Sequence, residues 1–237
     1  RTAGPDKSAP FPHAMMPQAS HDEQARLAFV QDFKKHLALT VMPGNRPIYE
    51  RRVEPAFRTR HGRAPSTRQE VRGEMQGTPY YQMFGSLQRT SQEMLWHGVS
   101  ETVARQVRGL DARAGPAPRE KHRATLALDS VLRPPRYMSA VDIHCMPGGY
   151  AGEAMGETAA GAIYNLGVLH YAMSSLGPNN DMAGGRMIAA LESGFGELRP
   201  KHILDLGCTV GNSTLPYREA FPEAEIHAID VSAPVLR

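Results

Sequence analysis

The last third of the sequence alternates between two short apolar runs and a helical pattern, and this alternation limits the fold more than any other feature. Residues 202–206 (HILDL) form an apolar run that ends at Gly207, and a second run, 225–230 (EIHAID), ends in an acid. Between them, a turn is followed by a helical pattern that reaches about Phe221. Strand, glycine turn, helix and strand in this order indicate a βαβ unit with buried parallel strands. The sequence therefore predicts an α/β fold here, with a ligand at the carboxyl ends of the strands.

The glycine turn is compatible with two kinds of nucleotide-binding site, and the spacing of its glycines separates them. A dinucleotide site requires G-x-G-x-x-G, so that a pyrophosphate can approach the helix N-terminus. Counted from Gly207, the second and third glycine positions hold Thr209 and Asn212. The alternative pattern has an acid two residues before the first glycine, and glycine at the first, third and fifth positions of the turn. Asp205, Gly207 and Gly211 satisfy this pattern, while Thr209 departs from it. The spacing thus favours the alternative over an NAD site.

The segment 203–212 (ILDLGCTVGN) resembles motif I of the class I S-adenosylmethionine-dependent methyltransferases. The match includes Asp230, the acid at the end of the second strand, nineteen residues after Gly211. The resemblance implies a Rossmann-like sheet and S-adenosyl-L-methionine as the cofactor. It covers residues 202–237 at the level of motifs. A helical region ahead of the catalytic domain is also common in this family.

The resemblance also implies roles for the residues of the motif. Asp205 would position the methionyl ammonium, and Asp230 would accept hydrogen bonds from the ribose hydroxyls, with Val231 against the adenine. The glycines would let the backbone pass close to the cofactor, where a side chain would collide. The expected cofactor-binding residues are Asp205, Gly207, Cys208, Thr209, Gly211, Asp230 and Val231.

A class I methyltransferase domain normally has seven strands, and two are expected before Arg237. The remaining sheet would need on the order of another hundred residues, given usual strand and helix lengths. We therefore expect residues 199–237 to be the start of a truncated cofactor-binding domain. Residues 1–237 alone are expected to bind the cofactor poorly or not at all.

The first half of the chain is predicted to be helical. Ser20 and Glu23 have the spacing of a capping box, and apolar residues follow at helical intervals. Further helix starts are indicated at Asn45 with Pro47, at Ser66 with Glu70 and at Thr78 with Pro79. The predicted organisation is a disordered lead (1–19), a helical domain (20–110), a linker (111–124), a connecting strand, turn and helices (125–198), and the start of the cofactor-binding domain (199–237).

The helical region carries most of the positive charge. Residues 46–123 hold fourteen arginines and one lysine against eight acids, whereas the whole chain has a net charge of +3. A basic helical surface can contact RNA phosphates. The charges alternate with acids along the sequence, however, and a solvated amphipathic face accounts for them as well. We favour the solvated face.

Residues 136–153 (RYMSAVDIHCMPGGYAGE) are the most unusual stretch outside the glycine turn. The first half alternates like a short strand, and Met146–Tyr150 has the composition of a turn. One interpretation is a turn that closes over the cofactor or acceptor. His144 would then be a base, because imidazole titrates near neutral pH, and Tyr150 is a second candidate catalytic residue. The other is a strand edge and turn that pack between two domains. We favour the packing role.

Other chemistry has less support in the sequence. The ten histidines are scattered, so no metal site is expected. Cys208 lies at a helix N-terminus, where a thiol can become reactive, but packing is the favoured role since no histidine partner is identifiable. The two cysteines make no disulfide framework, and no apolar run is long enough to span a membrane. We expect a cytoplasmic protein.

The sequence thus predicts a methyltransferase that acts on a small-molecule acceptor. An RNA or protein methyltransferase is the alternative within enzymes, because the acceptor-binding motif lies outside the residues that match. A non-catalytic interaction protein, in which the βαβ unit is a remnant, is the alternative from another class.

Overall fold

The computed structural model describes residues 15–114, 125–152 and 155–237. These residues form two compact units. The helical unit comprises residues 25–94, and the mixed unit comprises the described residues before 25 and after 94. Most of the predicted lead, and residues 115–124 of the predicted linker, lie outside the described residues. Because both long helices run from one unit into the other, the units do not coincide with the ranges expected from the sequence.

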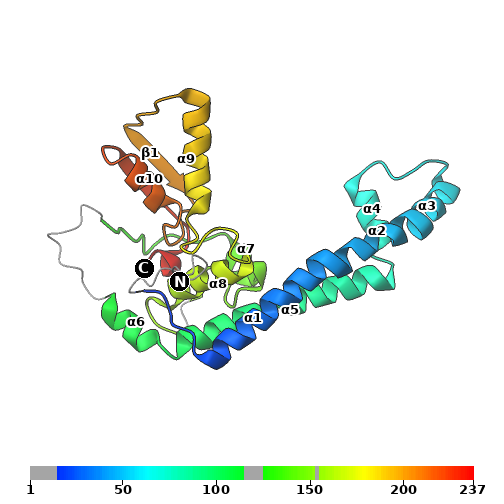
Figure 1. Cartoon of the computed structure of the whole chain (residues 1–237), viewed down its shortest axis with the longest axis horizontal. Coiled ribbons are helices and arrows are strands. Elements are labelled where there is room, and N and C mark those ends of the chain that lie inside the picture. Colours follow the sequence, from blue (N-terminus) through cyan, green and yellow to red (C-terminus); the bar gives the residue numbers. More distant parts are fainter. Residues whose placement is uncertain (1–14, 115–124, 153–154) are drawn as a thin grey trace, which may run out of the picture. The chain divides into compact units, whose positions relative to one another are not determined.

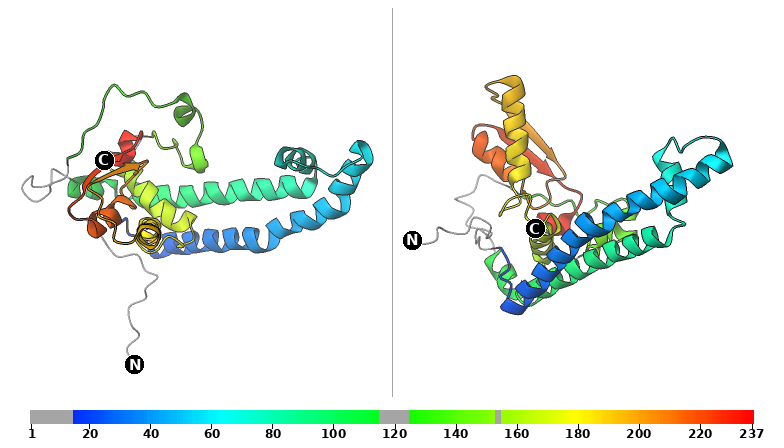
Figure 2. Two further views of the ribbon diagram at one scale, coloured as in Figure 1. Left: turned by 90° about the horizontal axis from the view of Figure 1, so that it is seen from above. Right: turned by 45° about the vertical axis from the view of Figure 1, so that its right-hand side comes forward.

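The helical unit consists of two long helical runs and a short helix that connects them (Figures 1 and 2). The first run continues without a break from α1 to α3, and the second is α5, which lies alongside it in both figures. The elements are α1 (His21–His36), η1 (Leu37–Val41), η2 (Met42–Gly44), α2 (Asn45–Ile48), η3 (Tyr49–Val53), α3 (Glu54–His61), α4 (Arg68–Met75) and α5 (Pro79–Ala104).

The helix start expected at Asn45 is wrong, because the chain is already helical there. Gly44, the residue before α2, has helical dihedral angles, and so does Val41 before η2. The elements η1 and η3 are π-helical, with wider turns than an α-helix. Such turns let a helix absorb irregular hydrogen bonding. The run therefore passes Pro43 and Pro47 without ending.

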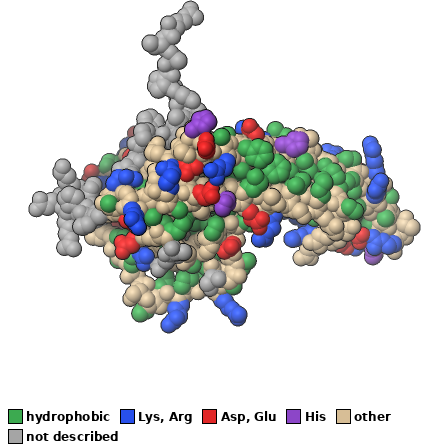
Figure 3. Space-filling view, turned by 90° about the horizontal axis from the view of Figure 1, so that it is seen from below, with side chains coloured by type: hydrophobic (Ala, Val, Ile, Leu, Met, Phe, Trp, Pro, Cys, Tyr) green, Lys and Arg blue, Asp and Glu red, His purple; other side chains and the backbone are tan. Residues whose placement is uncertain are grey.

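Side chains connect the two runs of the helical unit. The Tyr80 hydroxyl donates to the Val41 carbonyl at 2.8 Å, and Lys34 Nζ donates to Gln92 Oε1 at 3.3 Å. Figure 3 shows hydrophobic side chains gathered on one face over this unit. The large apolar side chains that the unit exposes are Phe29, Leu39, Met42, Met83 and Met94.

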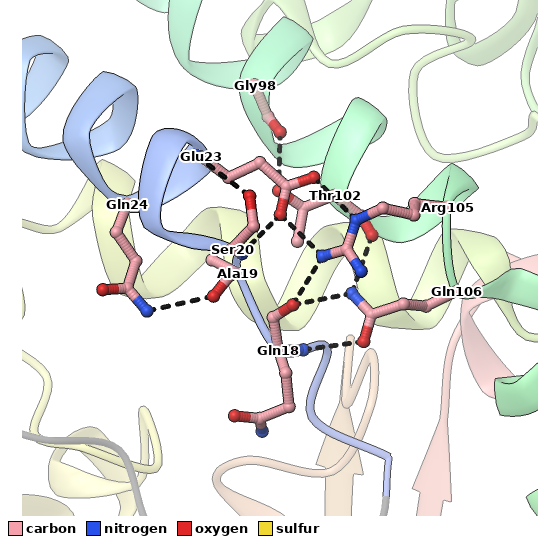
Figure 4. Close-up of polar contacts among 9 residues, drawn as sticks. All are labelled: Gln18, Ala19, Ser20, Glu23, Gln24, Gly98, Thr102, Arg105 and Gln106. Carbon is pink, nitrogen blue, oxygen red and sulfur yellow. Dashed lines mark hydrogen bonds and ion pairs between the residues drawn. The ribbon is translucent and has the colours of Figure 1, made fainter.

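The capping box at the start of α1 is confirmed and belongs to a larger polar cluster (Figure 4). The Ser20 amide donates to Glu23 Oε2 at 2.7 Å, and the Glu23 amide donates to Ser20 Oγ at 3.3 Å. Arg105, just after α5, donates to both oxygens of the Glu23 carboxylate at 3.0 and 2.7 Å. Gln106 donates to the Gln18 carbonyl at 2.9 Å. These bonds hold the segment before α1 against the end of α5.

The mixed unit contains the βαβ segment and the helices around it. Its further elements are α6 (Val107–Arg113), α7 (Arg136–Ala140), η4 (Ile143–Cys145), α8 (Ala159–Tyr171), α9 (Met182–Phe195), β1 (His202–Leu206), α10 (Thr214–Ala220), β2 (Glu225–Ile229) and α11 (Ala233–Leu236). The chain is thus a mixed α/β protein in which helix predominates. No helix within the described ranges is long and apolar enough to cross a membrane.

The two strands are parallel, as the sequence predicts, and His202 lies opposite Glu225 while Leu206 lies opposite Ile229. The expectation that they are buried is wrong for the described residues. Leu204 is 60% exposed, Leu206 69% and Ile229 52%. These side chains share one face of the sheet, because side chains alternate along a strand. The opposite face, which carries Asp205, is the one that α10 contacts.

The strand expected in the first half of 136–153 is also wrong, because Arg136–Ala140 is the helix α7. Pro134 and Pro135 directly precede it, and Pro135 is the N-cap residue. Proline is well suited to the start of a helix because its φ angle is already fixed. A short apolar alternation does not distinguish a strand from one turn of helix.

Candidate functional site

The turn between β1 and α10 is held in conformations that suit glycine. Gly207 has a φ of 80° and Gly211 a φ of 83°, both in the left-handed region. The Gly207 amide donates to the Ile229 carbonyl at 2.8 Å, and the Gly211 amide donates to the Cys208 carbonyl at 2.8 Å. An L side chain is strained at such angles. The turn therefore requires both glycines that the motif contains.

Thr209 stands between them with a φ of 50°. A β-branched residue is rarely found in this region, since its side chain crowds the backbone. Thr209 is the position where the sequence departs from the motif. Its backbone nevertheless adopts a left-handed conformation, so the turn keeps its shape at the cost of local strain.

Asp230 accepts two backbone hydrogen bonds, one of which joins it to the glycine turn. The Thr209 amide donates to Asp230 Oδ2 at 3.0 Å, and the Ser232 amide donates to Oδ1 at 2.7 Å. Each carboxylate oxygen can accept two hydrogen bonds, so each retains capacity for another donor. The arrangement presents a fixed carboxylate that can receive two hydroxyl groups.

Asp205 lies at the end of β1 and faces α10. Its Oδ2 accepts a hydrogen bond of 2.6 Å from the hydroxyl of Thr214, the first residue of α10. Burial and the negative charge of Asp205 raise the pKa of Tyr217, on the same helix. The end of β1 therefore carries a second carboxylate whose position is fixed by the following helix.

The backbone at Gly207 borders open space. A Cβ atom placed on Gly207 would have no other heavy atom within 4 Å. Two carboxylates, Asp205 and Asp230, belong to the same turn region. They suit a ligand that bears an ammonium group and hydroxyls, and they oppose a pyrophosphate by like-charge repulsion. The residues present thus fit S-adenosyl-L-methionine better than a dinucleotide.

Cys208 and Val231 complete the expected set. The Cys208 side chain is buried, and burial, together with the charges of Asp230 and Asp205, raises the pKa of its thiol. A reactive cysteine needs the opposite shift. Packing is therefore the role that the environment of Cys208 favours, while Val231 is half-buried beside Asp230.

The structure brings His144 and Tyr150 together. His144 Nδ1 lies 2.7 Å from Tyr150 Oη, and their rings meet edge-on. The Ser232 hydroxyl donates to the Tyr150 carbonyl, which connects this turn to the residue two positions after Asp230. His144 and Tyr150 thus belong to a turn that is bonded to Ser232, the N-cap residue of α11.

Three further contributors were not found from the sequence. Tyr164 and Tyr171, on α8, extend a row of rings: Tyr164 is next to Tyr150, and Tyr171 is next to His144. Trp96, at 2% exposure, donates its indole N–H to the His144 carbonyl at 2.8 Å. The spacing of Tyr164 and Tyr171, seven residues apart and therefore on one helix face, was the available signal.

Comparison with protein-family models, with curated proteins and with solved structures finds no match to the chain. The assignment of this site therefore rests on its residues and geometry. Among the residues described by the structure, no three histidine, cysteine, aspartate or glutamate side chains gather as metal ligands would.

Proposed function

We propose that this chain carries cofactor-binding residues of a class I S-adenosylmethionine-dependent methyltransferase with a Rossmann-like sheet. The observation that supports this most is the hydrogen bond from the Thr209 amide to Asp230, at 3.0 Å. It joins the glycine turn to the acid at the end of the second strand. Asp205, fixed by Thr214, supplies the second carboxylate.

In this proposal Asp230 receives the ribose hydroxyls, and Asp205 receives the methionyl ammonium directly or through water. Gly207 leaves space for the cofactor, and Val231 lies against the adenine. Bound S-adenosyl-L-methionine supplies an electrophilic methyl group. The chain's own residues hold donor and acceptor in line, and such positioning accounts for much of catalysis.

A small-molecule acceptor is favoured over RNA because five of the ten arginines in the helical unit are paired with acids. Ion pairs join Arg46 to Glu50, Arg58 to Glu54, Arg60 to Glu74, Arg63 to Glu70 and Arg89 to Glu93. A paired guanidinium contributes less to a polyanion-binding surface than a free one. These contacts are typical of a solvated helical surface.

Isothermal titration of the full-length protein with S-adenosyl-L-methionine tests the proposal. We expect one site, and about 10-fold to 100-fold weaker binding for Asp230→Ala, since hydrogen bonds to a charged group contribute about 1.5–3 kcal/mol each. Glu219→Ala, which removes an exposed acid from α10, is the matched control and should bind as the wild type does. An absence of heat above background in the wild type would refute the proposed methyltransferase function.

A further inference from the structure

The contact between His144 and Tyr150 involves a strained backbone that is held by a partly buried hydrogen bond. His144 has a φ of 56° and Cys145 a φ of 59°, so two successive residues with side chains adopt the left-handed conformation. Strain of this kind persists only where the surroundings impose it, and it concentrates at functional sites. Here the Trp96 indole N–H holds the His144 carbonyl at 2.8 Å. Trp96 is thus a positioning residue for His144.

The pair spans the boundary between the protein and solvent. Tyr150 is half-buried, whereas the His144 side chain is exposed. Their polar atoms, Tyr150 Oη and His144 Nδ1, are 2.7 Å apart, which is a good distance for proton transfer. A proton accepted at the inner residue therefore has a path of one hydrogen bond to a group in contact with water.

Tyr150 is connected to the cofactor-binding residues through Ser232. The Ser232 hydroxyl donates to its carbonyl, and the Ser232 amide donates to Asp230 at 2.7 Å. Burial raises the pKa of Tyr150 to about 12, with further contributions from Tyr164, Tyr171 and Asp230. The phenol consequently keeps its proton near neutral pH. To accept a proton from the acceptor, the phenol must therefore give its own proton to another group.

We infer that Tyr150 and His144 form a proton relay for an acceptor that bears a hydroxyl or an amine. This rests on the proposed function and adds the chemical class of the acceptor. As the O–H or N–H bond of the acceptor breaks, its proton passes to Tyr150 Oη and the phenol proton passes to His144 Nδ1. The electron pair left on the acceptor forms the new bond to the methyl carbon, and the carbon–sulfur pair stays with sulfur. The sulfonium charge is thereby replaced by an imidazolium charge, and His144 releases the proton to water.

Within the described residues, aromatic side chains surround the His144–Tyr150 pair, and one carboxylate lies near it. His144 faces Tyr150 and Tyr171, and Tyr150 faces His144 and Tyr164, with the charge of Asp230 near enough to act on it. A carboxylate acceptor would need no such relay, since it carries no proton near neutral pH. The relay therefore predicts a hydroxyl or amine acceptor rather than a carboxylate.

Nitrogen NMR of the histidine-labelled full-length protein tests the relay without any acceptor. We expect His144 Nδ1 to be the unprotonated nitrogen of the neutral ring and its resonance to move in Tyr150→Phe. Tyr137→Phe, a change at an exposed tyrosine of α7, should leave it in place. A proton on Nδ1, or equal spectra for the two variants, would overturn the relay.

Methyl transfer from labelled S-adenosyl-L-methionine to a phenol, a primary amine and a carboxylic acid supplies the second measurement. His144→Asn is the informative variant, because asparagine tolerates a positive φ and offers an oxygen near the Nδ1 position but does not titrate. We expect it to slow transfer to the phenol or amine at least about 100-fold and to flatten the pH profile. Transfer to the carboxylic acid alone, or an unchanged rate in His144→Asn, would overturn the relay. Titration with S-adenosyl-L-methionine separates the two proposals, since failure of cofactor binding refutes the proposed function, whereas binding with protonated Nδ1 refutes the relay alone.

Discussion

The amide of Thr209 donates to the carboxylate of Asp230 at 3.0 Å, from a backbone conformation that threonine rarely adopts. The bond ties the turn after the first strand to the end of the second. Gly207 and Gly211 meet the same conformational demand without strain. The turn therefore keeps a left-handed backbone at Thr209 that threonine disfavours.

We expect Thr209→Gly to stabilise the protein. A left-handed conformation costs a residue with a Cβ atom about 1–2 kcal/mol. The greater freedom of glycine in the unfolded chain offsets about 0.5–1 kcal/mol of that gain. Thermal unfolding, followed by the fluorescence of Trp96, the chain's one tryptophan, measures the difference. Thr209→Ala keeps the Cβ and should gain less; a lower melting temperature for Thr209→Gly would contradict the prediction.

Gly167 is required for the contact between α8 and Trp96. A Cβ atom placed on Gly167 would lie 2.0 Å from Trp96 Cζ3. We expect Gly167→Ala to destabilise the protein by about 1–3 kcal/mol, the usual cost of overpacking. Gly185→Ala is the matched control in α9, where the new methyl group meets no atom within 4 Å and should stabilise by about 1 kcal/mol. Chemical denaturation of both variants measures the contrast, and equal shifts would be inconsistent with the contact.

Glu23 should make stability depend on acid pH. The hydrogen bond from Arg105 holds its pKa down to about 2, against the opposing effect of burial, with help from Ser20. Because the folded-state pKa is depressed from its usual 4.5, the stabilisation is complete above about pH 4.5 and is lost as the pH falls towards 2. Unfolding curves recorded between pH 2 and 6 should show this loss in the wild type. In Glu23→Gln, the free energy of unfolding should change less with pH over this window. An unchanged pH dependence would argue against the ion pair.

His170 should make stability depend on pH over a different range. Burial lowers its pKa to about 4, so the folded protein holds this ring neutral where the unfolded chain protonates it. Stability is therefore complete above about pH 6.5 and declines as the pH falls to about 4. His170→Gln should remove the decline between pH 6.5 and 4.5 and leave the Glu23 window as it is. The two variants thus serve as controls for each other in one set of unfolding curves.

The βαβ segment was predictable because its signals are local. Glycines at 207 and 211 mark the turn, and Asp230 follows at the spacing that one helix and one strand require. The parallel pairing of β1 and β2 follows from that connection. The exposure of Leu204 and Ile229 was not predictable, because burial depends on what covers the sheet rather than on the strand's own sequence.

The surroundings of the site were less accessible from the sequence. The residue types of His144 and Tyr150 stand out in the sequence, but their contact depends on a left-handed backbone that the bond from Trp96 helps to hold. Trp96 is 48 residues away in the chain, on a helix that the sequence treats as a separate domain. The alternation in the first half of 136–153 predicts a strand wrongly, because Pro135 favours the start of a helix there.

If the proposed function holds, Ser232 also has a kinetic consequence. Its amide donates to Asp230, its hydroxyl donates to the Tyr150 carbonyl, and the Val235 amide donates to that hydroxyl. Because this one residue is bonded to both Asp230 and Tyr150, a donor bound at Asp230 would also restrict the position of Tyr150. The donor molecule would then set the position of Tyr150 before the acceptor arrives, so the two substrates should bind in a compulsory order, donor first.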